Sequence, residues 1–483
     1  MLRVEVKNLG PIAEGIIDLK PLTVFIGKNN IGKSYMAMLI YAAMRTSRHG
    51  NFPEFPLGLF DPPMRFFYDT NLLFRNSFVH TVTETKALDK GGRISSAPEI
   101  DLQQLREQVA KTTVAMADTF AKGLAHELQR CFATTVSRLK RQRQSVNGLG
   151  ISFKTPKMYM KFSCSDAIIK AFPPEADISD DLLRRTLGKA MKQVERLHIK
   201  DAKETRAYIL GQSVSEILMS LVKEIQLKPY YLPAARSGIL QSHKALASYI
   251  VSRSPLAGIE DMEIPKFSGV IADFLGSLLR LEKRKPGKLN ALAKFLEEDL
   301  TKGEIEIKVD EHQYPEIFYR SAAGRFALHR TSSMVSELAP IILFFRHIVE
   351  PGDLLIIEEP EAHLHPENQR KMAKALVGLV RTGVKVIITT HSDYLLDQLS
   401  NYVCRGQLSV EERAEQNVGQ DDYLGIDDIG VYLFKHDEAK GGTVVQGIKV
   451  TPEDGIADEE FTKVAKELYE ETYQLRRKLL VKS

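Results

Sequence analysis

The sequence predicts an α/β fold assembled from both ends of the chain. Three observations support this prediction. A glycine-rich turn, Gly27–Ser34, lies directly between a short apolar run and a helical pattern. An apolar run ends in two adjacent acids at Leu354–Glu359, and another ends in a histidine at Val386–His391. Continuous apolar runs of this length are typical of strands in a parallel sheet that is covered on both faces.

The length and composition fit a globular protein of two or three domains. The chain has 483 residues, 43% of them hydrophobic, which is enough for a sizeable core. Its three cysteines are far apart, so they predict neither a disulfide framework nor a Cys-x-x-Cys zinc site. No apolar run reaches the length of a membrane span, and the charged start does not resemble a signal peptide. We therefore expect a cytoplasmic protein with no membrane partner.

The charge balance gives only a weak indication of partners. The formal net charge is +4 and the pI is about 8.6. Two basic clusters, at 138–143 and 283–288, would contact phosphates if each lay on one face. Such basic runs more often form solvated helix ends. Nucleic-acid binding is therefore possible but not indicated by the charge.

The N-terminal residues read as strands followed by a helix. Leu2–Val6, Gly15–Leu19 and Leu22–Ile26 have strand patterns, and a helix is expected to begin near Lys33. After an irregular loop at Gly50–Pro63, helical spacing extends over 101–143 and 180–227, with a strand pattern at 151–162 between them. These ranges predict an inserted, mostly helical arm.

The C-terminal half returns to α/β patterns. After a strand at 229–232 and helix over 244–300, a hairpin is expected at 304–328, with its turn near Gly324. The expected elements that follow are a buried helix at 334–349, a strand at 354–357, a helix at 368–381, a strand at 384–389, strands over 429–450 and a helix at 459–478. The predicted domains are an N-terminal lobe (1–48), the arm (49–228), the rest of the α/β head (229–428) and a small strand–helix unit (429–483).

The first chemical motif is a complete phosphate-loop pattern, Gly27-Lys28-Asn29-Asn30-Ile31-Gly32-Lys33-Ser34. Its glycines allow backbone N–H groups to turn toward phosphates, and the following helix adds the positive end of its dipole. Lys33 is expected to reach the β- and γ-phosphates, and Ser34 to bind Mg²⁺ through its hydroxyl. The motif therefore predicts ATP and Mg²⁺ as ligands.

Paired acids at a strand end form the second motif. Glu358 is expected to face the magnesium ion, while Glu359 reaches the water that attacks the γ-phosphate. An ordinary strand end also explains two such acids, but the phosphate loop in the same chain favours this Walker B interpretation. His391, after the next apolar run, is expected at the same sheet edge, where it can sense the γ-phosphate.

These motifs resemble those of the ABC-type ATPases that include the recombination clamps, the structural-maintenance-of-chromosomes proteins and the overcoming-lysogenization-defect nucleases. The first residues, Val4–Ile12, are similar to the first strand of that family, and Glu359–Pro366 is similar to its Walker B and D-loop. Within the family, the chain looks closest to small ATPases of bacterial antiphage defence operons, such as the ATPase subunits of the PARIS and Septu systems. The resemblance implies an ABC-type head formed from both chain ends.

The resemblance also implies roles for individual residues. It assigns Lys33 to phosphate binding, Glu359 to catalysis and His391 to the switch position. It further suggests a signature segment at Thr331–Glu337, in which Ser332 and Ser333 contact the ATP of the opposite subunit. Met334 stands where the family usually has glycine, and Glu358 where it usually has aspartate. Arg236 is expected either near the nucleotide or in a surface salt bridge.

Two other polar groups are less indicative of function. His363 and His365 alternate as metal ligands can, but with no third ligand nearby they more plausibly shape a dimer contact. Asp421, Asp422, Asp427 and Asp428 lack the strand context of a nuclease centre and read as a solvated loop.

Together these features predict an ATPase that closes as a dimer or larger homo-oligomer over two ATPs. The resemblance to defence operons implies a switch that holds or releases a separate effector protein, for example a nuclease. The alternatives are a DNA-repair clamp whose arm carries DNA, and a nucleotide-locked scaffold that barely turns over.

Overall fold

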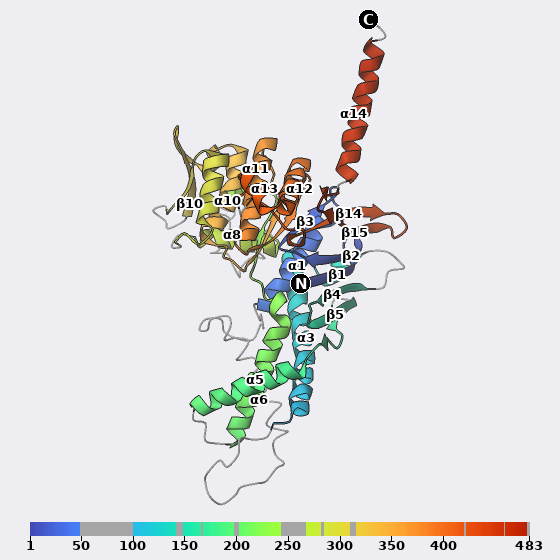
Figure 1. The fold of residues 1–483 in the computed structure, drawn as a ribbon, viewed down its shortest axis with the longest axis vertical. Helices are drawn as coiled ribbons and strands as arrows, with labels where there is room; N and C mark the ends of the chain where they lie inside the picture. Colours follow the sequence, from blue (N-terminus) through green and yellow to red (C-terminus); the bar gives the residue numbers. More distant parts are fainter. Residues whose placement is uncertain are drawn as a thin grey trace, which may run out of the picture. The chain divides into compact units, whose positions relative to one another are not determined.

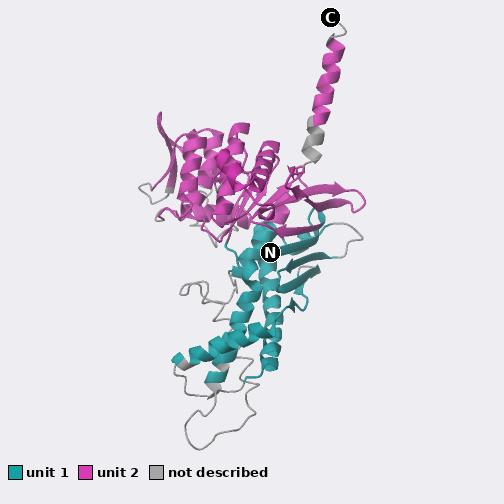
Figure 2. Ribbon diagram, in the orientation of Figure 1, with its two compact units in different colours: residues 1–14, 38–228 teal, residues 15–37, 229–483 magenta. Residues whose placement is uncertain are grey.

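The structure is a computed structural model. It describes residues 1–48, 100–141, 148–165, 168–197, 202–242, 267–281, 285–309, 315–419, 422–457 and 459–480. The chain forms two compact units, coloured separately in Figure 2. Unit 1 contains residues 1–14 and 38–228, and unit 2 contains residues 15–37 and 229–483. Strand β2 (Ile12–Leu19) and helix α1 (Lys33–Arg48) are divided between the units.

Unit 2 has a mostly parallel sheet at its centre (Figure 1). The strand order is β15-β14-β3-β13-β12-β8, and every neighbouring pair except β14 and β15 is parallel. The bounds are β3 (Leu22–Ile26), β8 (Pro229–Leu232), β12 (Leu354–Glu358), β13 (Lys385–Thr389), β14 (Ile429–Asp437) and β15 (Gly442–Ile448). The predicted buried strands are confirmed, and β12 and β13 are parallel neighbours as expected.

Apolar helices complete the core of this unit. Helix α10 (Ser333–His347) is buried from Val335 to Phe345, and it joins α9 (Asn290–Leu296), α11 (Pro366–Arg381) and α12 (Asp393–Gln407) in one hydrophobic cluster with the strands. The other helices among the described residues of this unit are α8 (Gly269–Leu279), α13 (Val410–Glu415) and α14 (Glu459–Leu480), with a π-helical turn at Glu297–Thr301. The expected helices at 334–349 and 368–381 are thus present with small shifts at their ends.

A separate antiparallel sheet follows the π-helical turn. Its order is β11-β10-β9, from β9 (Glu304–Val309), β10 (Pro315–Ser321) and β11 (Gly324–Ala327). The expected turn near Gly324 is present between β10 and β11, and Gly324 has a φ of 126°. A third strand, β9, extends the predicted hairpin.

Unit 1 combines an antiparallel sheet with long helices. The sheet order is β6-β5-β4-β1, from β1 (Leu2–Leu9), β4 (Leu149–Lys154), β5 (Met158–Ser165) and β6 (Ile168–Ala171), and β7 (Glu175–Ala176) pairs with β5. The helices are α3 (Leu102–Phe132), α4 (Val136–Leu139), α5 (Asp180–Leu197) and α6 (Ala202–Val222). Phe120 of α3 packs its ring on Phe153 and Phe162, which joins the longest helix to the sheet.

Three sequence expectations differ from the structure. The helix expected over 101–143 ends at Phe132, because Ala133 adopts a left-handed backbone with a φ of 49°. The single strand expected at 151–162 is a hairpin, with Thr155 bonding to Met158 at its turn. Strands β14 and β15 belong to the large sheet beside β3 and form no separate unit, because a strand pattern carries no information about its pairing partner.

The chain divides into units at 14/15, 37/38 and 228/229, and only the last division coincides with a predicted domain boundary. The expected loop at 50–63, parts of both basic clusters and Asp421 lie outside the described residues. No helix among the residues that the structure describes is long and apolar enough to span a membrane.

Candidate functional site

The phosphate-loop pattern lies where the sequence predicts it, between β3 and α1. Strand β3 ends at Ile26 and the helix begins at Lys33. Gly27 has a φ of 132°, and a Cβ atom there would lie 2.4 Å from the backbone oxygen of Phe434 in β14. Only glycine fits this position without displacing the neighbouring strand. Lys28, Asn29 and Asn30 are exposed, as a loop that receives a ligand requires.

The side chain of Lys33 bonds back to the loop that precedes it. Its Nζ atom donates to the backbone oxygens of Gly27 and Lys28, both at 2.8 Å, and lies 2.9 Å from Nε2 of His391. Burial lowers the pKa of Lys33 to about 8, although the carboxylates of Glu359, Glu358 and Glu361 act in the opposite direction. The ammonium group is thus held by carbonyl oxygens that phosphate oxygens can replace.

The two adjacent acids of the predicted Walker B motif occupy different environments. Glu358 ends β12; its Oε2 accepts from the backbone N–H of Ala234 at 3.3 Å, and its Oε1 is buried with no hydrogen-bond partner. Glu359 is 41% exposed at its side chain and lies with Oε1 3.9 Å from Nε2 of His391. Its φ of 45° is strained for a residue with a side chain. The structure therefore separates an acid with a buried carboxylate oxygen from one with an accessible carboxylate.

His391 follows β13 at the same sheet edge. Because β12, β13 and β3 are parallel neighbours, their carboxyl ends bring Glu359, His391 and Lys33 together. Burial and the charge of Lys33 lower the pKa of His391, so its ring is neutral near pH 7 and can accept a hydrogen bond from Lys33.

Glu361 holds the His391 backbone, a role that the sequence did not suggest. Its Oε1 accepts from the Thr390 hydroxyl at 2.6 Å and from the His391 N–H at 2.9 Å. Burial raises the pKa of Glu361 in spite of these bonds. The third acid of the Glu-Glu-Pro-Glu sequence was the available signal, since a buried acid needs partners of this kind.

Arg236 is completely buried, so the alternative of a surface salt bridge is wrong. Its guanidinium donates to the backbone oxygens of Glu358 at 2.7 Å and Glu359 at 3.2 Å. Its Nε lies 3.2 Å from Oε2 of Glu337 in α10. Arg236 therefore joins the Walker B backbone to the helix that begins in the signature segment, and it helps to fix the strained conformation of Glu359.

The predicted signature segment, Thr331–Glu337, includes the exposed start of α10. Ser332 is the N-cap and accepts from Val335 N–H at 3.4 Å, and both Ser332 and Ser333 are exposed. A helix N-terminus with exposed hydroxyls is suited to a phosphate group. Met334 contributes its sulfur to a contact with Asn368 of α11, 3.5 Å away. The departure from glycine thus has a packing role.

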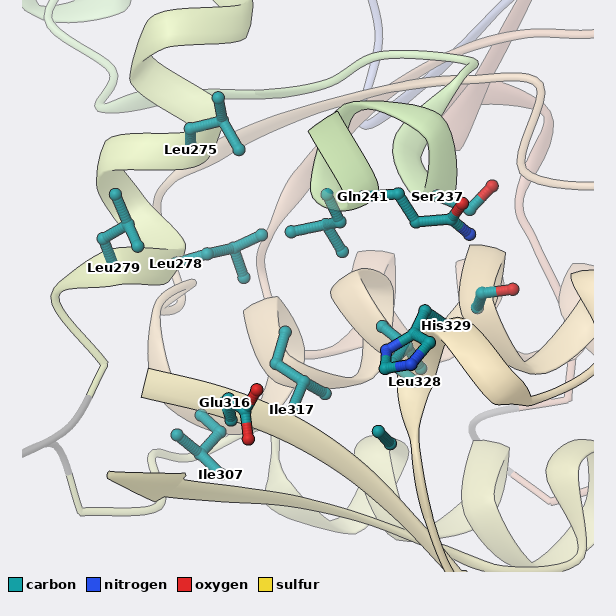
Figure 3. Close-up of a pocket in the computed structure, with 13 residues that line it drawn as sticks. Ser237, Gln241, Leu275, Leu278, Leu279, Ile307, Glu316, Ile317, Leu328 and His329 are labelled. Carbon is teal, nitrogen blue, oxygen red and sulfur yellow. The ribbon is translucent and has the colours of Figure 1, made fainter. Parts of the chain in front are cut away.

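A cavity of about 230 Å³ lies beside this segment (Figure 3). Its walls include Ser237, whose N–H and hydroxyl both donate to Oε1 of Glu337, at 3.2 and 2.6 Å. The other lining residues are mostly apolar: Leu240, Gln241, Leu275, Leu278, Leu279, Ile307, Glu316, Ile317, Ala327, Leu328, His329 and Ser336.

The residues predicted for Mg²⁺ fit that ion. Magnesium usually takes one or two protein ligands and fills its shell with water and substrate phosphates. Ser34 lies in the first turn of α1, and the unpartnered Oε1 of Glu358 is a buried carboxylate oxygen available to a metal-bound water. His365 instead caps α11 by accepting from the Glu367 N–H at 3.4 Å.

The fold and this edge of the sheet define a P-loop nucleoside-triphosphatase. A model of the AAA ATPase domain matches residues 1–396, and the chain belongs to that family. No curated protein sequence matches it.

Several solved structures are loosely similar. An SMC head bound to the C-terminal winged-helix domain of ScpA has 10% identity and a TM-score of 0.39, over 92% of this chain and 97% of that one. An SMC head domain from Thermotoga maritima has 9% identity and a TM-score of 0.33, over 93% and 98%. An Smc head with an extended coiled coil, bound to the C-terminal domain of ScpA from Pyrococcus furiosus, has 11% identity and a TM-score of 0.37, over 97% and 99%.

Proposed function

We propose that this chain binds ATP with Mg²⁺, closes as a homodimer or larger homo-oligomer over two nucleotides, and hydrolyses them as a switch. The meeting of Lys33, His391 and Glu359 at the ends of three parallel strands carries this proposal. A phosphate-binding cation, a γ-phosphate sensor and an accessible carboxylate are the groups that phosphoryl transfer to water requires.

Each residue has a distinct role in this proposal. ATP phosphates replace the Gly27 and Lys28 oxygens around Nζ of Lys33, while the loop N–H groups and Ser34 complete the phosphate and metal contacts. Mg²⁺, when bound, neutralises charge on the β- and γ-phosphates. Glu358 orients a metal-bound water, and Glu359 takes a proton from the attacking water. Ser332 and Ser333 contact the ATP bound by the partner subunit.

The switch is proposed to act in bacterial antiphage defence, where it holds or releases a separate effector protein. Support comes from the resemblance of Val4–Ile12 and Glu359–Pro366 to ATPases of defence operons, together with the buried link from Arg236 to Glu337. Through that link, the Walker B backbone is bonded to Arg236, and Arg236 is paired with Glu337 of the proposed signature helix. A change of nucleotide state can therefore change the surface that a partner contacts.

Turnover and assembly measured together test this function. We expect phosphate release that requires Mg²⁺, dimer formation with ATP in sedimentation experiments, and copurification of one effector with the chain when the neighbouring genes are coexpressed. Strong stimulation by duplex DNA would instead favour a DNA-repair clamp. Tight ATP binding with negligible phosphate release would favour a locked scaffold.

A further inference from the structure

The C-terminal helix α14 exposes apolar side chains that a stable helix normally buries. Every residue from 466 to 479 is exposed. Leu468, Leu475 and Leu479 are 60%, 56% and 67% exposed, and Tyr469 and Tyr473 are also more than half exposed. Because most helical stability in proteins comes from packing of an amphipathic face, and because surface helices bury one apolar face, this helix is suited to a partner surface.

The spacing of these residues is that of a coiled-coil seam. Leu468, Thr472, Leu475 and Leu479 are separated by four, three and four positions, which corresponds to the d, a, d and a positions of a heptad. The hydroxyl of Thr472 donates to the backbone oxygen of Leu468 at 2.9 Å, so its polar group is satisfied within the helix. The seam can therefore be buried against another helix at little polar cost.

The charges beside the seam fit a second copy of the same helix. Acids at Glu470 and Glu471 precede a basic run at 476–478, so this part of the helix changes from acidic to basic along its length. Two copies in antiparallel orientation, with Leu468 packed on the partner's Leu479 and Thr472 on the partner's Leu475, place Glu471 opposite the partner's Lys478. The same register places Arg476 over the ring of the partner's Tyr469. Each contact occurs twice.

We propose that α14 forms an antiparallel coiled coil with α14 of a second copy of this chain. This contact is separate from closure over ATP and needs no nucleotide. It keeps two chains together between rounds of ATP binding, which raises the effective concentration for head closure.

Sedimentation equilibrium of the full chain without nucleotide tests the pairing. We expect the wild-type chain to self-associate and Leu475→Asp to weaken association by about a hundredfold, because a charge enters the seam. Tyr473→Asp is the matched control: Tyr473 is 52% exposed but lies outside the a and d positions, so association should stay within about threefold of wild type. A monomeric wild-type chain, or equal effects of the two substitutions, would overturn the proposal.

A charge exchange tests the orientation. In the antiparallel pair, Lys478→Glu sets a second carboxylate against the partner's Glu471 at both ends, so association should weaken by about tenfold or more. The double variant Glu471→Lys with Lys478→Glu should restore it. In a parallel pair Lys478 faces no acid of α14, so an unchanged association of Lys478→Glu would refute the antiparallel arrangement. Leu475→Asp should still release phosphate at high protein concentration. Failure of the α14 pairing can therefore be distinguished from failure of the proposed ATPase function.

Discussion

The phosphate loop and the signature segment are held in place by different kinds of contact. The loop is fixed by its own backbone, by Gly27 packed against β14, and by Lys33 bonded to oxygens within the same octet. The signature segment is fixed from a distance, through Glu337, Arg236 and the oxygens of Glu358 and Glu359. The proposed phosphate site is thus encoded in eight consecutive residues, whereas the segment proposed to contact a partner subunit depends on buried polar contacts between distant elements.

The largest expected effect comes from breaking the loop itself. Lys33→Ala should abolish ATP binding, because it removes the charge that pairs with the phosphates. Calorimetry measures this loss directly. Lys28→Ala is the control, since Lys28 is exposed and contributes only its backbone oxygen to the Lys33 contact, so we expect it to retain most of the affinity. Wild-type affinity in Lys33→Ala would show that the nucleotide binds elsewhere.

The next largest effects are expected from substituting the paired acids, Glu358 and Glu359, one at a time. Glu359→Gln should leave ATP bound and intact and reduce phosphate release by about 10² to 10⁴, because a general base is lost. Glu358→Gln should mainly weaken Mg²⁺-dependent binding, since the buried Oε1 is assigned to the metal's water shell. Nucleotide binding and phosphate release are measured for both variants. Equal, mild effects would contradict the Walker B assignment.

Arg236→Met tests the long-range link. The substitution leaves Glu337 buried without its cation and removes one donor from each of the two Walker B oxygens, so the free energy of unfolding should fall by about 3–5 kcal/mol. Denaturant unfolding measures the change. Adding Glu337→Leu should recover part of the stability, because it removes the uncompensated charge. Phosphate release should stay low in the double variant, since the Glu359 backbone oxygen still lacks its bond from Arg236, and full recovery would refute the positioning role.

Ser333→Arg tests the signature segment alone. A bulky side chain at the exposed start of α10 should leave ATP binding by one subunit nearly intact but obstruct closure. Overpacking at a contact costs about 1–3 kcal/mol, so turnover should fall by about tenfold or more. Sedimentation with ATP reports the dimer. Survival of both closure and turnover would show that Thr331–Glu337 is not a signature segment.

The same difference explains how far the sequence alone was informative. Motifs contiguous in sequence, with the strands that carry them, were predicted close to their observed bounds, because apolar runs and glycine turns are local signals. Arg236, Glu337 and Glu361 were missed or left open because burial depends on distant elements. The pairing of β14 with β3 was missed for the same reason, as strand composition does not name a neighbour.

The smallest predicted effect concerns pH and tests the charge of Lys33 in the phosphate loop. Burial lowers the pKa of Lys33 to about 8 in the nucleotide-free chain. ATP binds the chain in which Lys33 is protonated, so the titration of Lys33 should not change ATP affinity well below pH 8. It should fall by up to about tenfold per pH unit as the pH rises above 8, because binding must then recover a proton. Calorimetry between pH 7 and pH 9.5 gives the profile.

Glu359→Gln provides a second and independent check of that profile. The carboxylate of Glu359 is the largest influence that raises the pKa of Lys33, so its removal should lower that pKa and move the decline in ATP affinity to lower pH. Ser333→Arg, which changes no group near Lys33 in the same subunit, should leave the profile in place. A decline at the same pH in Glu359→Gln and the wild-type chain would mean that the charge of Glu359 does not influence the pKa of Lys33.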